Sequence, residues 1–91
     1  MNGQRFGRAE GAAAGIVDGE TVVVSPSDLR YHALNTTGTA LWDLLADGTT
    51  LDQAVERLMA SFEVDESTCR HDVEACLDHF VSIGIAVPAD G

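Results

Sequence analysis

The sequence predicts an α+β domain in which a three-stranded antiparallel sheet comes first and three helices follow. Residues 1–29 are rich in glycine, valine and turn-forming pairs, which is typical of short strands. The second half contains three segments whose apolar residues recur every three or four positions, as in amphipathic helices. Strands followed by helices indicate a mixed fold built around one core.

The length and composition fit one small domain. A chain of 91 residues with 45% hydrophobic content buries only about 60–65% of its unfolded surface, so two domains are excluded. We expect one domain over residues 13–87, a flexible or weakly ordered N-terminus over 1–12 and a C-terminal tail over 88–91. The N-terminal segment offers little to bury apart from Phe6, and a short edge strand is the alternative there.

The first two strands are expected to form a hairpin over residues 13–17 and 20–25. The dipeptide between them, Asp18-Gly19, suits a two-residue turn because glycine accepts a positive φ and aspartate tolerates one. The turn-forming segment 25–28, Ser-Pro-Ser-Asp, then ends the second strand.

A third strand is expected over residues 29–34. Successive side chains of a strand point to opposite faces. One face therefore carries Leu29, Tyr31 and Ala33, and the other carries Arg30, His32 and Leu34. Leu34 is the predicted core residue of this strand.

The three helices have recognisable start signals. Asn35, Thr50 and Asp65 are good N-cap residues because their side-chain oxygens accept hydrogen bonds from first-turn amides. Thr50 and Gln53 together form a capping-box pattern. The predicted apolar stripes are Leu41, Trp42, Leu44 and Leu45 in the first helix and Leu51, Ala54, Val55, Leu58, Met59 and Phe62 in the second.

Glycines are expected to end the first and third helices, at Gly48 and Gly84. After the second of these, Ile85 should fold back onto Phe80. The third helix also has a wider apolar arc, about 160°, than the roughly 100° that a core-facing stripe needs. The surplus can be buried under the hairpin, or it can line a groove whose other wall is the unpaired edge of the third strand. Such a groove would suit an extended peptide.

The net charge is −10, from fifteen acids and five arginines. Nine of the acids lie within residues 47–78, and such a surface repels nucleic-acid phosphates and anionic lipids. It either attracts a cationic segment or serves solubility alone. No apolar run approaches the roughly 18 residues of a membrane helix, and the first residues lack a signal-peptide core. We therefore expect a cytoplasmic protein without a membrane or nucleic-acid partner.

The sequence contains no recognisable catalytic or cofactor-binding motif, and we expect no enzyme activity and no cofactor. Cys69 and Cys76 lie seven residues apart on one predicted helix, roughly 10.5 Å along its axis, which excludes a disulfide. A zinc ion could reach at most the pair Cys76 and His79, so no metal site is expected. His32 fits an ordinary surface or rim histidine.

An ordered set of short motifs resembles the PqqD-like family, the RiPP recognition elements that bind leader peptides of ribosomally made natural products. The resemblance covers about residues 15–87. The motifs are Tyr31-His32-Ala33-Leu34-Asn35, Thr37-Gly38, Leu41-Trp42, Asp47-Gly48-Thr49-Thr50, Asp72-Val73, Cys76-Leu77 and Gly84-Ile85. The resemblance implies a winged helix-turn-helix-like fold, a three-stranded antiparallel sheet followed by three helices, and a leader that adds as a strand beside the third strand.

The resemblance also implies which residues bind the peptide. The pairing edge would be Leu29, Arg30, Tyr31, His32 and Ala33, and the opposite wall would be Cys69, Asp72, Val73, Cys76, Leu77 and Phe80. Two positions depart from the family pattern: Cys76 replaces a larger apolar residue, often phenylalanine, and Phe80 replaces a leucine. The groove is therefore expected to have a shape of its own.

Our leading hypothesis is a non-catalytic module that captures a precursor peptide and presents it to a separate modifying enzyme or leader peptidase. A lasso-peptide pathway is preferred on the resemblance alone. The alternatives are a winged helix-turn-helix DNA-binding protein and a docking subunit of a larger enzyme. A recognition helix with Asp72, Glu74, Asp78 and one Arg70 has the wrong charge for DNA. The oligomeric state is left open, since a free strand edge can also pair with a second copy.

Overall fold

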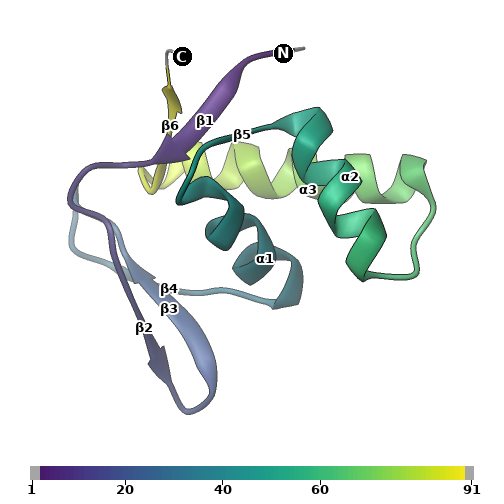
Figure 1. Ribbon diagram of the computed structural model, residues 1–91. Coiled ribbons are helices and arrows are strands. Elements are labelled where there is room, and N and C mark those ends of the chain that lie inside the picture. The colour runs from purple at the N-terminus through teal and green to yellow at the C-terminus, as the bar shows by residue number, and fades with distance from the viewer. Residues whose placement is uncertain (1–2, 90–91) are drawn as a thin grey trace.

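The computed structural model describes residues 3–89 and confirms the α+β fold (Figure 1). Strands and helices alternate more often than the sequence suggested. The elements in chain order are β1 Arg5–Arg8, β2 Ala13–Val17, β3 Glu20–Val24, β4 Tyr31–Ala33, α1 Thr36–Leu45, β5 Thr49–Thr50, α2 Leu51–Ser61, α3 Glu66–Ser82 and β6 Ala86–Ala89.

The strands of this described region form two antiparallel sheets instead of one. The sheet predicted from the sequence has the order β2-β3-β4, and a second sheet has the order β5-β1-β6. In Figure 1 the β2–β3 hairpin projects from one side of the helices, while β1 and β6 lie side by side at the opposite end.

The second sheet corrects both predicted ends of the domain. Residues 5–8 form its central strand, with Arg5 opposite Thr50 on one side and Ala89 on the other. Phe6 is only 7% exposed. The expectation of a weakly ordered N-terminus is therefore wrong for this strand, and residues 88–89 belong to β6 and not to a tail. Positions 1–2 and 90–91 of those two expectations lie outside the described residues.

Strand β1 is held by contacts that are distant in sequence. The Arg8 guanidinium stacks 4.1 Å from the centre of the Trp42 ring. Its Nε and Nη2 atoms also donate to the Trp42 carbonyl at 3.1 and 2.9 Å. These contacts join β1 to α1, and a local sequence pattern cannot reveal them.

The predicted hairpin is confirmed, with Asp18 and Gly19 at φ 52° and 82° in the turn. The third predicted strand is shorter than expected and is limited to Tyr31–Ala33. Leu29 has a left-handed φ of 59° and belongs to the turn before the strand. A residue in that conformation cannot continue a ladder.

The three predicted helix starts are confirmed. Asn35 Oδ1 accepts from Gly38 N at 2.8 Å, and Asp65 Oδ1 accepts from Thr68 N at 2.8 Å. Thr50 forms the complete capping box of α2. Four residues of the predicted apolar stripe of α2 are buried, namely Leu51, Ala54, Val55 and Leu58. The other two, Met59 and Phe62, are each 37% exposed.

The end of α3 also follows the prediction. Gly84 has φ +82°, its N–H donates to Val81 O at 3.1 Å, and Ile85 N–H donates to Phe80 O at 3.0 Å. These two bonds are the pattern of a glycine-ended helix. Ile85 is therefore folded back into the core, where it is 0% exposed.

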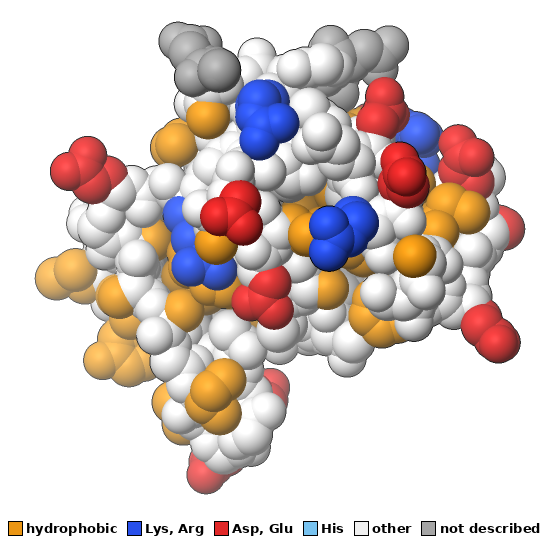
Figure 2. All heavy atoms as spheres, viewed as in Figure 1, with side chains coloured by type: hydrophobic (Ala, Val, Ile, Leu, Met, Phe, Trp, Pro, Cys, Tyr) orange, Lys and Arg blue, Asp and Glu red, His pale blue; other side chains and the backbone are white. Residues whose placement is uncertain are grey.

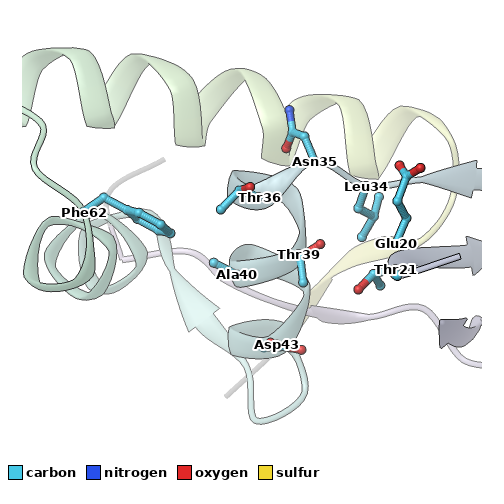
Figure 3. A pocket seen from close by; sticks show the side chains of 10 residues that line it. Glu20, Thr21, Leu34, Asn35, Thr36, Thr39, Ala40, Asp43 and Phe62 are labelled. Carbon is cyan, nitrogen blue, oxygen red and sulfur yellow. The ribbon is translucent and has the colours of Figure 1, made fainter. Parts of the chain in front are cut away.

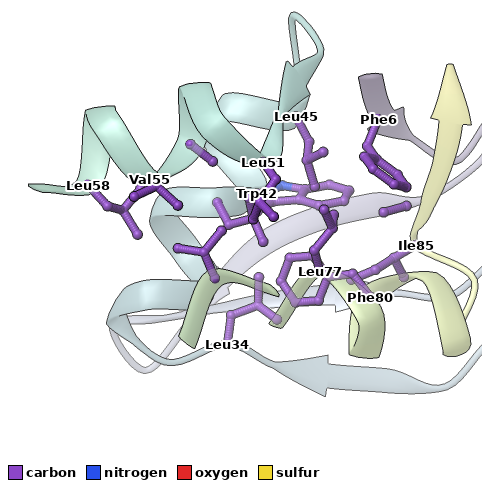
Figure 4. Close-up of a cluster of buried hydrophobic side chains, with 14 of the residues drawn as sticks. Phe6, Leu34, Trp42, Leu45, Leu51, Val55, Leu58, Leu77, Phe80 and Ile85 are labelled. Atoms are coloured by element: carbon purple, nitrogen blue, oxygen red, sulfur yellow. The ribbon is translucent and has the colours of Figure 1, made fainter. Parts of the chain in front are cut away.

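One core lies between the three helices and the second sheet (Figure 4). Burial of this apolar surface is the main stabilising contribution to the fold. Its largest fully buried side chains include Leu41, Leu45, Leu77, Phe80 and Ile85.

The surface carries many acidic side chains, several of them on the face seen in Figure 2. Orange side chains are also visible on the projecting hairpin, where Ile16 and Val17 are exposed. Among residues 3–89, no helix has both the length and the apolar character needed to cross a membrane.

Substitution of Gly84 tests the left-handed end of α3. We expect Gly84→Ala to lower the free energy of unfolding by about 1–2 kcal/mol, because alanine disfavours a positive φ. The added Cβ would also lie 3.2 Å from Ser27 Oγ. Urea unfolding followed by circular dichroism measures the change.

Gly15→Ala is the matched control, because no atom lies within 4 Å of the Cβ that it adds. We expect it to leave the stability nearly unchanged or to raise it by about 0.4–1 kcal/mol. Equal losses in the two variants would contradict the role assigned to Gly84.

Candidate functional site

Strand β4 has an open edge. It lies at the margin of its sheet and pairs on one side with β3, with Leu34 N–H donating to Thr21 O at 2.8 Å. Residues of an antiparallel ladder direct their backbone groups alternately to one neighbour and to the other. His32 and Leu34 therefore face β3, whereas Tyr31 and Ala33 present their N–H and C=O groups to the open side.

A groove of about 420 Å³ lies between β4 and the C-terminal half of α3. Of the two fates considered for the surplus apolar residues of α3, the structure shows the groove. Cys76 and Ile83 line it and are partly buried, with Phe80 behind them. The complete lining is Tyr31, His32, Ala33, Leu34, Asn35, Gly38, Cys76, His79, Phe80 and Ile83.

The two walls of the groove are joined directly at one end. Ser25, which is 0% exposed, donates from Oγ to the carbonyl of Ile83 at the end of α3, at 2.7 Å. Ser25 N–H also donates to Arg30 O at 2.9 Å, just before β4 begins. The end of α3 is therefore tied to the turn that leads into β4, and the separation of the walls is set without a ligand.

His32 lines the groove but buries one of its ring nitrogens. Its Nε2 has no hydrogen-bond partner among the described residues. A buried polar group without a partner costs about 1–3 kcal/mol. Solvent does not reach this atom, so the cost is borne by the folded chain itself.

The structure divides the predicted site residues among four places. Tyr31, His32, Ala33, Cys76 and Phe80 line the groove. Leu29 and Arg30 precede β4 and are exposed, outside the groove lining. The placement of Leu77 in the groove wall needs correction, because this turn of α3 faces the core and Leu77 is 1% exposed (Figure 4).

The other three predicted residues line a separate pocket of about 230 Å³. Cys69, Asp72 and Val73 meet the first turn of α1 and the end of α2 there. The remaining lining residues are Thr36, Thr37, Leu58, Phe62 and Val64.

Sequence reasoning missed five residues of the groove lining. His79 and Ile83 follow Cys76 at helical spacing, so the period of α3 could have identified them. Leu34, Asn35 and Gly38 line the groove because β4 leads directly into α1.

A third hollow, of about 560 Å³, lies between the end of the β2–β3 hairpin and α1 (Figure 3). Glu20 and Asp43 lie at its margins, and Leu34 and Phe62 lie on opposite sides of α1. Nowhere in residues 3–89 do three His, Cys, Asp or Glu side chains gather in a way that could hold a metal ion.

The charges on α3 disfavour contact with DNA. Its single arginine, Arg70, forms ion pairs with Asp52 at 2.7 Å and with Glu66 at 3.4 Å. The hydrogen bond to Asp52 is the main cause that raises the pKa of Arg70. This cation is thus engaged by neighbouring carboxylates, and the acids of α3 repel phosphate.

Comparisons with known proteins agree with this geometry. The family model described as coenzyme PQQ synthesis protein D (PqqD) matches residues 20–86. The fold is similar to TbiB1 in complex with the TbiA(beta) leader peptide, with a TM-score of 0.80 and 20% identity over 93% of this chain and 99% of that one. It is also similar to lasso peptide synthetase B1 complexed with the leader peptide, with a TM-score of 0.79 and 22% identity over 91% and 98% of the two chains. No curated protein matches the sequence significantly.

Alkylation of the two cysteines tests the exposure of the groove. Burial raises the pKa of both thiols, and the reactive species is the thiolate. Below a raised pKa the thiolate is scarce, so labelling of Cys76 by iodoacetamide should be slow at pH 7. Its rate should rise about tenfold per pH unit up to pH 9, without reaching a plateau.

Cys69 serves as the internal control because it is only 3% exposed. We expect mass spectrometry to find it unlabelled until urea unfolds the chain. Equal labelling of the two thiols in the folded protein would contradict the placement of Cys76 at an open groove.

Proposed function

Because the chain belongs to the PqqD family, whose model matches residues 20–86, we propose that it binds the leader segment of a precursor peptide between β4 and α3. One observation carries the proposal: the open edge of β4 borders a groove whose opposite wall is α3. An extended peptide needs both features, a row of backbone partners and a place for its side chains.

The peptide would bind by strand addition. Its backbone pairs with the N–H and C=O groups of Tyr31 and Ala33, which β3 leaves free. Its side chains then alternate, one set entering the groove toward Cys76 and Ile83 and the other facing solvent. The backbone bonds are independent of sequence, so discrimination among peptides falls to the side chains that enter the groove.

The groove favours an apolar anchor. Phe80 and Ile83 offer apolar surface, and a few buried anchors dominate most peptide affinities.

The proposed role is non-catalytic. The bound precursor would be presented to a separate modifying enzyme or leader peptidase, which raises the local concentration of the substrate. Two solved structures with a similar fold are leader-peptide complexes, and one of them is a lasso peptide synthetase B1. This likeness supports the proposal of a role in a lasso-peptide pathway.

The net charge of −10 favours a basic leader. Raising the salt concentration from about 0.1 to 1 M shortens the screening length from about 10 to 3 Å. We expect the association rate of a basic leader to fall several-fold in stopped-flow measurements, with little change in the dissociation rate. A salt-independent association rate would argue against electrostatic steering.

Ala33→Pro tests strand addition. Proline removes the N–H group that faces the open side and leaves the bonds to β3 intact, since edge positions tolerate proline. We expect about a tenfold loss of affinity for a fluorescein-labelled peptide that is selected from a random 15-residue library against the whole chain, as measured by fluorescence polarisation.

Ala14→Pro is the matched control on the opposite edge of the same sheet. The two-residue turn pairs Val17 with Glu20, and the alternation of the ladder then directs the N–H of Ala14 away from β3. The Ala14→Pro variant should bind the labelled peptide with the affinity of the wild type. Circular dichroism should confirm that both variants are folded. Binding that tolerates Ala33→Pro as well as Ala14→Pro would overturn strand addition.

A further inference from the structure

The pocket between α1, α2 and α3 has an apolar floor. Leu58, Cys69 and Val73 are each less than 5% exposed, and they are contributed by α2 and α3. Phe62, which is 37% exposed, and the partly buried Val64 form the outer wall. The pocket is therefore open at the surface while its base belongs to the core.

The size of the pocket suits one side chain. Pockets that hold whole small molecules measure about 300–1,000 Å³, whereas this one measures about 230 Å³. Its floor has no charged group, and the charged lining residue is Asp72. A branched aliphatic or aromatic side chain fits this combination of volume and chemistry.

The pocket continues the groove along α3. Val73 in the pocket and Cys76 in the groove lie one helical turn apart. On the facing side, Asn35 lines the groove and the next residue, Thr36, lines the pocket. Figure 3 shows α3 running across the start of α1, from the side on which Phe62 lies to the side on which Leu34 lies.

The distance between the two places sets a spacing on the bound peptide. Phe80 and Val73 are seven residues apart on α3, which is about 10 Å along the helix axis. An extended chain covers this distance in about three residues, at roughly 3.3 Å per residue. Strand β4 runs toward the start of α1. A peptide that pairs antiparallel to β4 runs away from α1, so the peptide residues near the start of α1 are those that precede the paired segment. Antiparallel pairing is the commoner arrangement.

We propose that this pocket is a second subsite for the same peptide and receives one apolar side chain, three or four residues before the segment that pairs with β4. The proposal rests on the proposed function and extends it. It gives Cys69, Asp72 and Val73, which do not reach the groove, a place in peptide recognition. The first-turn amides of α1, at Thr36 and Thr37, have no partners within the helix and can donate to the passing peptide backbone.

A double-mutant cycle tests the subsite. The probe is a peptide selected from a random 15-residue mRNA-display library against the whole chain, then synthesised with a fluorescent label. Phe62→Ala should lower its affinity about tenfold. In an alanine scan of the peptide, one apolar residue before the paired segment should cost about tenfold with the wild type and less than twofold with Phe62→Ala.

Met59→Ala is the matched control, because Met59 is also 37% exposed and does not line the pocket. We expect it to change the affinity less than twofold. Val64→Ala removes the neighbouring part of the outer wall and repeats the test if Phe62→Ala lowers the stability of the fold.

The outcomes separate the subsite from the groove. If Ala33→Pro abolishes binding while Phe62→Ala behaves like Met59→Ala and no peptide residue couples to it, the subsite is wrong and the groove stands. If Ala33→Pro has no effect, strand addition itself is wrong. An apolar anchor found after the paired segment would overturn the proposed direction of the peptide.

Discussion

The fixed separation of β4 and α3 is the constraint on which the site depends. The hydrogen bond from Ser25 Oγ to Ile83 O joins the end of α3 to the turn that leads into β4. Gly84 completes this junction, because a side chain there would press on the Ser27 hydroxyl. The groove is therefore held open by contacts within the chain, and for the proposed peptide such a preformed site would spare the binding energy otherwise spent on ordering loops.

Some residues of α3 belong to the core and also line a hollow on the surface. Val73 and Phe80 are almost fully buried, yet each forms part of the lining of a hollow on the surface. The wide apolar arc of α3 makes this double use possible. Stability and recognition are coupled at such positions, so a substitution there changes both properties. Substitutions of residues at the rim of the pocket or at the strand edge, such as Phe62 and Ala33, should change the proposed peptide binding with less effect on stability.

The parts of the fold that could be predicted from the sequence are those with local signals. Asn35, Thr50 and Asp65 cap their helices through bonds spanning three residues, and Asp18-Gly19 defines its turn by itself. Strands β5 and β6 were missed, and β1 was considered only as an edge strand, because these strands pair with residues far away in the sequence. Helical period placed Leu77 on the apolar arc but could not tell which part of that arc faces the core. The division of the peptide-binding prediction into a groove and a separate pocket follows from how the first turn of α1 packs against α3, which only the tertiary structure reveals.

The pairing of β1 with β6 has a consequence for how this domain can be combined with others. Arg5 lies opposite Ala89, so the two strands carry the chain in and out of the domain at neighbouring points (Figure 1). A domain with this geometry can be spliced into a surface loop of a larger protein, or joined to one at either end, without rearranging its interior. The two linkers would emerge beside the second sheet, opposite the β2–β3 hairpin, and would leave the edge of β4 unobstructed.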